Sequence, residues 1–231
     1  MDVLVVRPKF DEATDETFKF AEEILKWCKD AGIPTRDMAI GDATRLPVEV
    51  ALVENPRIYV HYDHGSADAL IGNDSQPVID ISNCQILADK EVYTLACLSA
   101  KSLGVEIWRK GGKFWGYNQI VSFTTDALEE FQQAFNSGFK LRFIEGKTHE
   151  EALEGAREVF DDLALQLVST GNTIGAICMR ANRSSLRCFN AQAPDSECSL
   201  RRMLLRNLGP ERGWAVPSPR RVKMYLKAWL R

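Results

Sequence analysis

Apolar residues along the chain occur in two alternating patterns, short unbroken runs and longer stretches with helical spacing. The short runs are rich in β-branched and aromatic side chains, which is the composition of buried strands. They cover residues 3–6 (VLVV), 57–65 (RIYVHYDHG), 92–96 (VYTLA), 113–117 (KFWGY) and 119–123 (QIVSF). We predict a strand at each of these positions.

Longer stretches repeat apolar residues every three to four positions, which predicts amphipathic helices. These cover residues 18–28, 128–139 and 153–167. Gly32 offers an end to the first helix, and Thr125 is the candidate cap of the second. Thr148 and Glu151 form a capping-box pattern before the third, which ends at Gly171. Shorter helices are predicted near residues 48–53, 101–108 and 223–230.

Strands that alternate with helices predict an α/β domain with three layers, in which helices flank a mainly parallel central sheet. Parallel neighbours need crossover connections, which place helices on both faces of the sheet. The pattern extends to about residue 190 and then fades into a segment rich in Pro, Ser and Arg. We assign residues 1–190 to the domain and residues 191–231 to a basic C-terminal segment whose structure the sequence does not specify.

The composition, 45% hydrophobic and 26% charged in 231 residues, is that of a globular protein. No apolar stretch approaches the ~20 residues of a membrane-spanning helix. The first sixteen residues turn acidic early and lack the basic start and long apolar core of a signal peptide. We expect a cytoplasmic protein without a membrane partner.

Six cysteines lie at positions 28, 84, 97, 178, 188 and 198, and no two of them form a C-x-x-C pair. This spacing matches neither a disulfide framework nor a zinc site, so most of these thiols are expected to be buried. We predict no metal and no cofactor.

The net charge of −3 conceals an uneven distribution. Residues 180–231 carry twelve Lys or Arg and three acidic residues, so this end is basic and the rest of the chain is acidic. The asymmetry fits a basic end that packs on the acidic body, a surface for a regulatory protein partner, or nucleic-acid binding. Aromatic residues for base stacking are few there, which argues against nucleic acid.

Candidate chemistry lies at two strand ends. His64 follows the strand RIYVHYD and precedes Gly65, and Cys97 follows the strand VYTLA. Ligands bind at the carboxyl ends of parallel strands, so adjacent strands would place this thiol and imidazole at one edge. The imidazole then takes the thiol proton and later returns it to a leaving amine. The backbone N–H groups of Gly65 and Cys97 are candidate oxyanion donors.

Each of these residues also has a simpler interpretation. A cysteine after a strand is more often a core residue, and a histidine is more often a polar residue with satisfied hydrogen bonds. His61 competes for the role of base, but it lies inside the predicted strand and no glycine follows it. His149, near the start of a helix, is expected to be exposed to solvent. A histidine followed by glycine at one strand end, and a cysteine at a later strand end, together favour Cys97 and His64 as the catalytic residues.

A strand that ends in His-Gly, followed by a strand that ends in Ala-Cys, resembles the caspase-like cysteine peptidases. This superfamily includes caspases and metacaspases, gingipain and clostripain relatives, and separase-like bacterial CHAT-type domains. The run GGKFWGYNQIVSF is similar to the family's strand after the cysteine helix, and ALEEFQQAFNSGF and EGKTHEEALEGAREVF resemble its paired helices. The resemblance covers roughly residues 1–190.

The resemblance implies hydrolysis of peptide bonds by a dyad, with Cys97 as the nucleophile and His64 as the general acid and base. It requires no third member, so Asp63 need not orient the histidine. Leu-Ser-Ala follows Cys97 in place of the Arg-Gly or Gln-Gly of animal caspases, so cleavage after Asp is not implied. Relatives that cut after Arg or Lys carry an acidic residue beyond the next strand, where Asp126 lies. Helix capping is the favoured role of Asp126, and Asp68 is a further candidate for the rim of the substrate pocket.

The leading hypothesis is a cysteine endopeptidase that acts on a protein or peptide substrate through a thioacyl intermediate. The alternative is a catalytically idle caspase-like scaffold whose basic C-terminal segment binds a partner. The reactivity of the Cys97 thiol separates the two hypotheses, because a nucleophilic thiol alkylates fast and a buried thiol is inert.

Overall fold

The computed structural model of the protein describes residues 2–190, and residues 1 and 191–231 lie outside the described part. Its strands are β1 Val3–Arg7, β2 Thr35–Ala39, β3 Ile58–Tyr62, β4 Ala69–Ile71, β5 Pro77–Asp80, β6 Glu91–Leu95, β7 Lys113–Tyr117 and β8 Leu186–Phe189. Its helices are α1 Glu12–Asp30, α2 Arg45–Val53, α3 Leu103–Arg109, α4 Leu128–Phe139, α5 His149–Ser169 and α6 Thr173–Ser185. Short 3₁₀ turns cover Ile40–Asp42 and Cys84–Leu87, and a π-helical turn covers Lys140–Ile144. The helix predicted over 223–230 lies outside the described residues.

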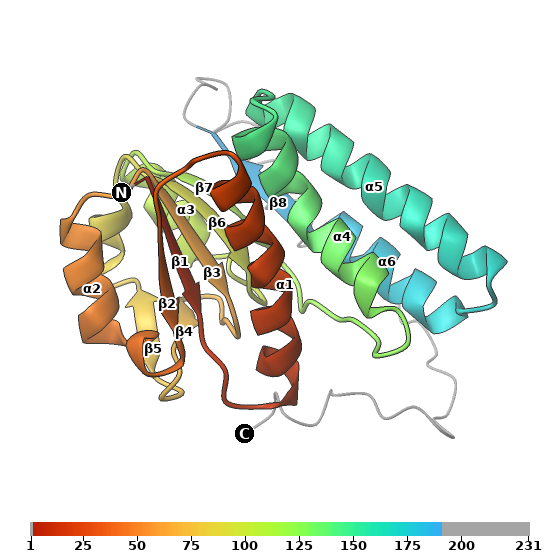
Figure 1. Ribbon diagram of the computed structural model, residues 1–231, viewed down its shortest axis with the longest axis horizontal. Helices are drawn as coiled ribbons and strands as arrows, with labels where there is room; N and C mark the ends of the chain where they lie inside the picture. The colour runs from red at the N-terminus through yellow and green to blue at the C-terminus, as the bar shows by residue number, and fades with distance from the viewer. Residues whose placement is uncertain (1, 191–231) are drawn as a thin grey trace, which may run out of the picture. The chain divides into compact units, whose positions relative to one another are not determined.

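The fold is α/β, with a six-stranded sheet in the order β2-β1-β3-β6-β7-β8 (Figure 1). Its first five strands in this order are parallel, and β8 runs antiparallel to β7. β4 and β5 form a separate antiparallel pair between β3 and β6 in the sequence. The predicted mainly parallel sheet flanked by helices is confirmed.

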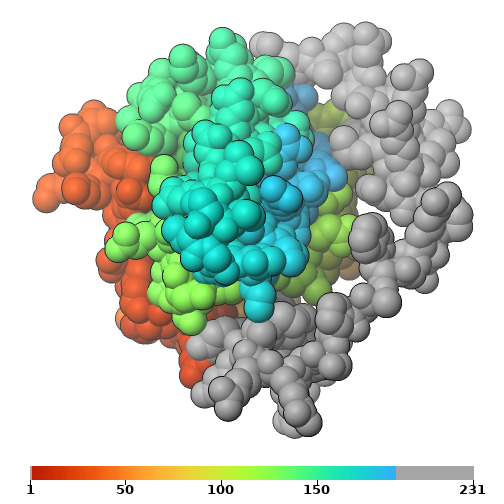
Figure 2. Space-filling model, turned by 90° about the vertical axis from the view of Figure 1, so that its right-hand side faces the viewer, coloured from red at the N-terminus to blue at the C-terminus, as the bar shows by residue number. Residues whose placement is uncertain are grey.

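Helices cover both faces of the central sheet. On one face, residues of α1, α4, α5 and α6 share a hydrophobic core with alternate residues of the strands, such as Val5, Val60 and Tyr62. On the other face, α2 contacts β1 and α3 contacts β7. Figure 1 shows α1 and α2 on opposite sides of the sheet, and Figure 2 shows α5 and α6 at the centre of the surface over the first face. The sheet is therefore the middle one of three layers.

Capping boxes begin two of the helices. The predicted box of α5 is confirmed, since Glu151 N–H donates to Thr148 Oγ1 at 3.2 Å and Thr148 N–H donates to Glu151 Oε2 at 2.9 Å. Asp11 and Thr14 form an equivalent box at the start of α1, which was not predicted. This second box fixes Asp11 close to the carboxyl end of β1.

Several local predictions are wrong or incomplete. Residues 119–123 form a loop rather than a strand, because their backbone groups bond to the Cys97 turn and to Asn182. Thr125 does not cap α4, whose N-cap is Ala127 without a side-chain hydrogen bond. β2, α6 and β8 were not predicted. The sequence of β2 does not look like a strand because it is mostly polar and only Met38 in it is buried.

Candidate active site

His64 and Cys97 lie at the same edge of the sheet because β3 and β6 are parallel neighbours. Tyr62 pairs with Leu95 at the last position of the register. The Asp63 N–H then donates to the Leu95 carbonyl at 3.2 Å, which extends the pairing by one residue. The condition on which the expectation depended, that the two strands are neighbours, is met, although both strands end earlier than predicted. His64 and Cys97 lie in the turns that follow them.

Gly65 brings the turn after β3 into close contact with the turn after β6. A Cβ atom on Gly65 would lie 2.8 Å from the Cys97 carbonyl oxygen and 2.9 Å from the Ala96 Cβ. Only a residue without a side chain permits this approach. Neither the Gly65 N–H nor the Cys97 N–H has a hydrogen-bond acceptor within residues 2–190. Both predicted oxyanion donors therefore lie next to each other, where the two turns touch.

The Cys97 thiol is closed off by the loop after β7. Its side chain is 3% exposed. Val121 N–H donates to Sγ at 3.1 Å, and Sγ donates to the Val121 carbonyl at 3.8 Å. Burial raises the pKa of Cys97 to about 11, against a smaller lowering by the Val121 backbone. In the described part of the chain, the thiol therefore bonds to Val121 rather than to His64.

The turn after Cys97 is tightly bonded and holds a strained residue. Leu98 has a φ of 58°, in the left-handed region that costs a non-glycine residue roughly 1–2 kcal/mol. Its N–H donates to the Gln119 carbonyl at 3.0 Å. The buried Ser99 hydroxyl donates to the Ala96 carbonyl at 2.9 Å. These bonds fix the backbone of Cys97 between β6 and α3.

A buried asparagine of α6 holds the loop that covers Cys97. Ser122 N–H donates to Asn182 Oδ1 at 3.1 Å, and Asn182 Nδ2 donates back to the Ser122 carbonyl at 2.6 Å. Asn182 is fully buried. We call this pair of hydrogen bonds the Asn182 clamp. It fixes the residue next to Val121, and so keeps Val121 on the thiol.

His64 is bonded to the first residue of the α1 capping box. Its Nε2 lies 2.6 Å from Asp11 Oδ2, and the Phe10 ring packs edge-on at 5.5 Å between ring centroids. Burial alone would raise the pKa of Asp11, but the hydrogen bonds from His64 and from the Thr14 N–H lower it to about 2. Asp11 is therefore ionised at neutral pH.

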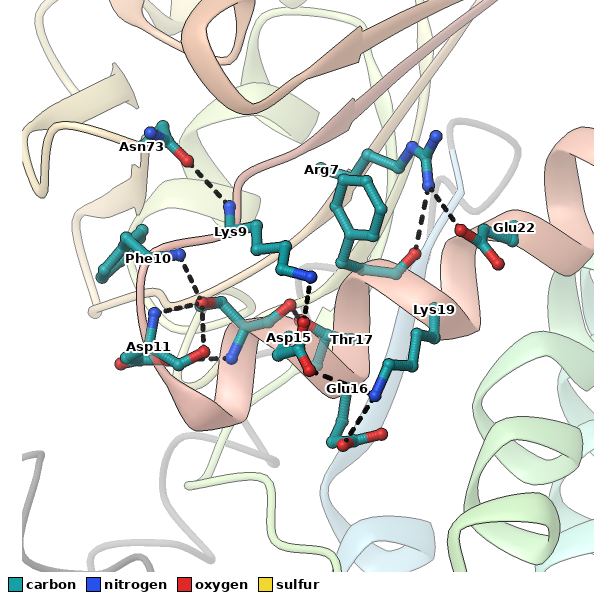
Figure 3. A network of polar contacts seen from close by, with 12 residues as sticks. Arg7, Lys9, Phe10, Asp11, Asp15, Glu16, Thr17, Lys19, Glu22 and Asn73 are labelled. Atoms are coloured by element: carbon teal, nitrogen blue, oxygen red, sulfur yellow. Dashed lines mark hydrogen bonds and ion pairs between the residues drawn. The ribbon is translucent and has the colours of Figure 1, made fainter.

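A polar network fixes the segment that carries Asp11 (Figure 3). The N–H groups of Phe10 and Asp11 both donate to Thr14 Oγ1, each at 2.9 Å. The Lys9 N–H donates to Asn73 Oδ1 at 2.8 Å, which ties the segment to the connection between β4 and β5. These hydrogen bonds fix the backbone on both sides of Asp11, and so they fix the position of its side chain.

Asp63, next to His64, is a buried carboxyl group. It is 4% exposed, and neither of its oxygens has a hydrogen-bond partner of normal geometry among the described residues. Burial raises the pKa of Asp63 well above its usual value, and the negative charge of Asp11 adds to the rise. This environment favours the protonated acid.

The other two histidines have structural surroundings. His61 is fully buried between the Tyr59 hydroxyl at 3.0 Å and the Ile71 carbonyl at 2.9 Å, and burial lowers its pKa to about 3. The prediction that His149 is exposed is wrong. It is 7% exposed and binds Glu91 Oε2 at 2.9 Å, at the opposite end of β6 from Cys97.

The two acidic residues predicted for the substrate pocket are both exposed. Asp68 lies in the turn between Gly65 and β4. Asp126 lies in the same loop as Val121, and the nearby Thr124 hydroxyl and Asn172 amide lower its pKa. Asp126 directly precedes Ala127, the N-cap of α4, and its side chain does not cap the helix. A favourable effect of its charge at the helix start stays a prediction. A role of either acid in substrate binding stays a prediction.

No protein-family model matches the chain, and a search of curated proteins finds no match either. Within residues 2–190, no cluster of three or more His, Cys, Asp or Glu side chains is placed to hold a metal ion. No helix in that range is long and apolar enough to cross a membrane.

Two residues of this site were missed by the sequence reasoning. Asp11 lies in the motif D-x-x-T after a strand, which is a signature of a helix start. That signature, combined with a strand order that places β1 beside β3, would have pointed to His64. Asn182 carries no local signal, because its partner Ser122 lies 60 residues away.

Proposed function

We propose that the protein is a cysteine endopeptidase of the caspase-like type. The observation that carries the proposal is the meeting of two turns at one edge of a parallel sheet. Adjacent strands deliver His64 and Cys97 to this edge, and Gly65 packs directly on the Cys97 carbonyl group. The resemblance of the His-Gly and Ala-Cys strand ends to that superfamily supports the same assignment.

In the proposed reaction, His64 removes the proton from Cys97 Sγ, and the thiolate attacks the carbonyl carbon of the scissile peptide bond. The negative charge that forms on the carbonyl oxygen is accepted by the N–H groups of Gly65 and Cys97. His64 then donates the proton to the leaving nitrogen, the C–N bond breaks, and a thioacyl group remains on Cys97. Water, deprotonated by His64, releases the acid and restores the thiol.

Under this proposal, the buried Cys97 thiol corresponds to a closed state of the enzyme. With a pKa of about 11, roughly one Cys97 thiol in 10⁴ is ionised at pH 7. Val121 offers the thiol one donor and one acceptor of the backbone. An extended substrate presents the same two groups, so we propose that its backbone replaces Val121 when the loop opens.

The alternative function is an idle scaffold, and the burial of Cys97 favours it. A thiol that is 3% exposed and bonded to Val121 has the surroundings of a packed core cysteine. The basic segment that would bind a partner in this case, residues 191–231, lies outside the described residues. Binding of a regulatory protein or of nucleic acid by this segment therefore stays a prediction.

The proposal is tested by the variants Cys97→Ala and His64→Ala in a peptide-library cleavage assay. Each is expected to lower kcat/KM by at least about 10³-fold, because the nucleophile and its base act as one unit. Cys84→Ala is the matched control, since it removes another fully buried thiol that lies outside the proposed site. Undiminished cleavage by either purified variant would contradict the proposal.

Covalent labelling separates the peptidase from the scaffold. Peptides that end in an acyloxymethyl ketone are expected to modify Cys97 of the peptidase, and modification is located by mass spectrometry of the digested protein. Loss of labelling in His64→Ala would support the dyad. An idle scaffold would react no faster at Cys97 than at Cys84.

A further inference from the structure

A carboxylate from the start of α1 is bonded to the proposed catalytic histidine. Asp11 Oδ2 and His64 Nε2 are 2.6 Å apart, a short contact typical of a charge-assisted hydrogen bond. The side chains are 33% and 15% exposed, so solvent screens this pair less than a surface pair. The caspase-like resemblance requires no third member, so it did not identify Asp11.

The Asp11 carboxylate is held rigidly, with a separate bond for each oxygen. Oδ1 accepts from the Thr14 N–H at 2.8 Å, and Oδ2 faces His64. Thr14 is 1% exposed, and its hydroxyl oxygen accepts from two backbone N–H groups of the same turn. The neighbouring Phe10 ring lies edge-on to the imidazole. One turn of chain therefore sets both the position and the tilt of the His64 ring.

The charge of Asp11 decides which ring nitrogen carries the proton. Asp11 remains ionised at neutral pH, and an ionised carboxylate accepts hydrogen bonds but donates none. Nε2 must therefore be the protonated nitrogen of the neutral imidazole, and Nδ1 carries the lone pair. In the proposed reaction, Nδ1 of this tautomer would be the base for the Cys97 thiol. When Nδ1 takes that proton, Asp11 also stabilises the resulting imidazolium.

We propose that Asp11 is a positioning residue for His64, which fixes the ring and the Nε2–H tautomer that proton transfer from Cys97 requires. The proposal rests on the proposed peptidase function and adds a third member to its dyad. Asp11 itself stays ionised throughout, while the proton moves from Sγ to Nδ1 and from Nδ1 to the leaving nitrogen. The same carboxylate also caps α1, so Asp11 both begins the helix and orients His64.

Two substitutions separate these roles of Asp11. In Asp11→Asn, the amide oxygen still caps the Thr14 N–H, but the amide NH₂ donates to Nε2 and forces the proton to Nδ1. In Asp11→Ser, the hydroxyl keeps a good N-cap but is too short to reach His64. Both variants are therefore expected to fold, and Thr148→Ala is the matched control because it removes the equivalent cap from α5.

We expect kcat to fall by about 10²–10⁴-fold in Asp11→Asn and Asp11→Ser, as for other catalytic histidines that lose their orienting carboxylate. KM is expected to stay within about threefold, because Asp11 does not touch substrate. Thr148→Ala should lower the unfolding midpoint and leave kcat unchanged. A wild-type kcat in Asp11→Asn would overturn the proposal.

Nitrogen-15 NMR of the His64 ring tests the positioning role without any substrate. The wild type is expected to show the Nε2–H tautomer, and Asp11→Asn the Nδ1–H tautomer. An unchanged tautomer would overturn the role of Asp11. If the wild type cleaves no peptide but the tautomer reverses in Asp11→Asn, the peptidase proposal fails and the positioning contact stands.

Discussion

His61, Asp63 and Asp11 are ionisable residues near one strand end, and their surroundings change each of them differently. Burial lowers the pKa of His61 to about 3 and raises the pKa of Asp63 well above its usual value, so both favour their neutral forms. Asp11 stays charged because bonds from His64 and Thr14 outweigh its burial and lower its pKa to about 2. Near His64, Asp11 is therefore the charged carboxylate, and Asp63 favours its neutral form.

Replacing Asp63 with Asn is expected to stabilise the protein increasingly as the pH rises above about 4. The folded-state pKa of Asp63 lies above its unfolded-state value, so the unfolded chain releases this proton first. Stability is then lost at about 1.4 kcal/mol per pH unit until the folded-state pKa is reached. Urea unfolding of both proteins from pH 4 to pH 8 measures the difference. Asp68→Asn, at an exposed acid of the same turn, is the control, and a gap that stays constant with pH would contradict the prediction.

The sequence could place His64 and Cys97 after strands, but it could not identify the residues that bind them. A strand end followed by a small residue is a local pattern, visible within ten positions of the chain. The bond from His64 to Asp11 spans 53 residues, and the bond from Ser122 to Asn182 spans 60. Such contacts depend on strand order, which the periodicity of one segment does not contain.

At the scale of elements, the central strands were predictable and the edges of the sheet were not. β1, β3 and β6 are almost entirely buried, so their sequences are predominantly apolar or aromatic. β2 and β8 are the edge strands, and each has polar residues at partly exposed positions. Residues 119–123 have the composition of a strand, but their hydrogen bonds close the Cys97 turn instead of pairing with β7.

Removing the Asn182 clamp is expected to expose Cys97. Two hydrogen bonds worth about 1 kcal/mol each hold Ser122, so Asn182→Ala should raise the open population by about thirtyfold. Alkylation of Cys97 by iodoacetamide, followed by mass spectrometry, should accelerate by the same factor. Met179→Ala is the control for a general loosening of α6, since Met179 is equally buried but forms no part of the clamp. Equal acceleration in both variants would contradict a specific clamp.

The whole described domain carries polar clusters at both ends of its sheet. His64 and Asp11 lie at the carboxyl end. At the other end, Glu91 binds His149 and Arg142, each at 2.9 Å. These bonds lower the pKa of Glu91 to about 2 although burial alone would raise it. Because the pKa values of Asp11 and Glu91 are both lowered, their contribution to stability is present above about pH 4.5 and is lost towards pH 2.

His61 is expected to oppose the effect of Asp63 on the stability of the whole protein. Its pKa is about 3 when folded and about 6.5 when unfolded, so the unfolded state binds the extra proton between these values. Stability from His61 therefore rises with pH across this window, by up to about 1.4 kcal/mol per unit. In the wild type this slope opposes that of Asp63, whose raised pKa makes stability fall as the pH rises above about 4.

Urea unfolding at several pH values tests this opposition. Above about pH 4, the stability of His61→Gln should change less favourably with rising pH than that of the wild type, because only the Asp63 slope remains. Adding Asp63→Asn should reverse this difference. The comparison uses slopes, so a general loss of stability in either variant does not affect it. Parallel profiles for His61→Gln and the wild type would show that His61 does not titrate on unfolding.

The two bonds of the Asp11 carboxylate make the start of α1 a reporter of events at His64. An inhibitor that draws the imidazole away is expected to free Oδ2 and to change the hydrogen bond between Oδ1 and the Thr14 N–H. Hydrogen–deuterium exchange at the Thr14 amide, in α1, would then show whether an inhibitor has moved His64.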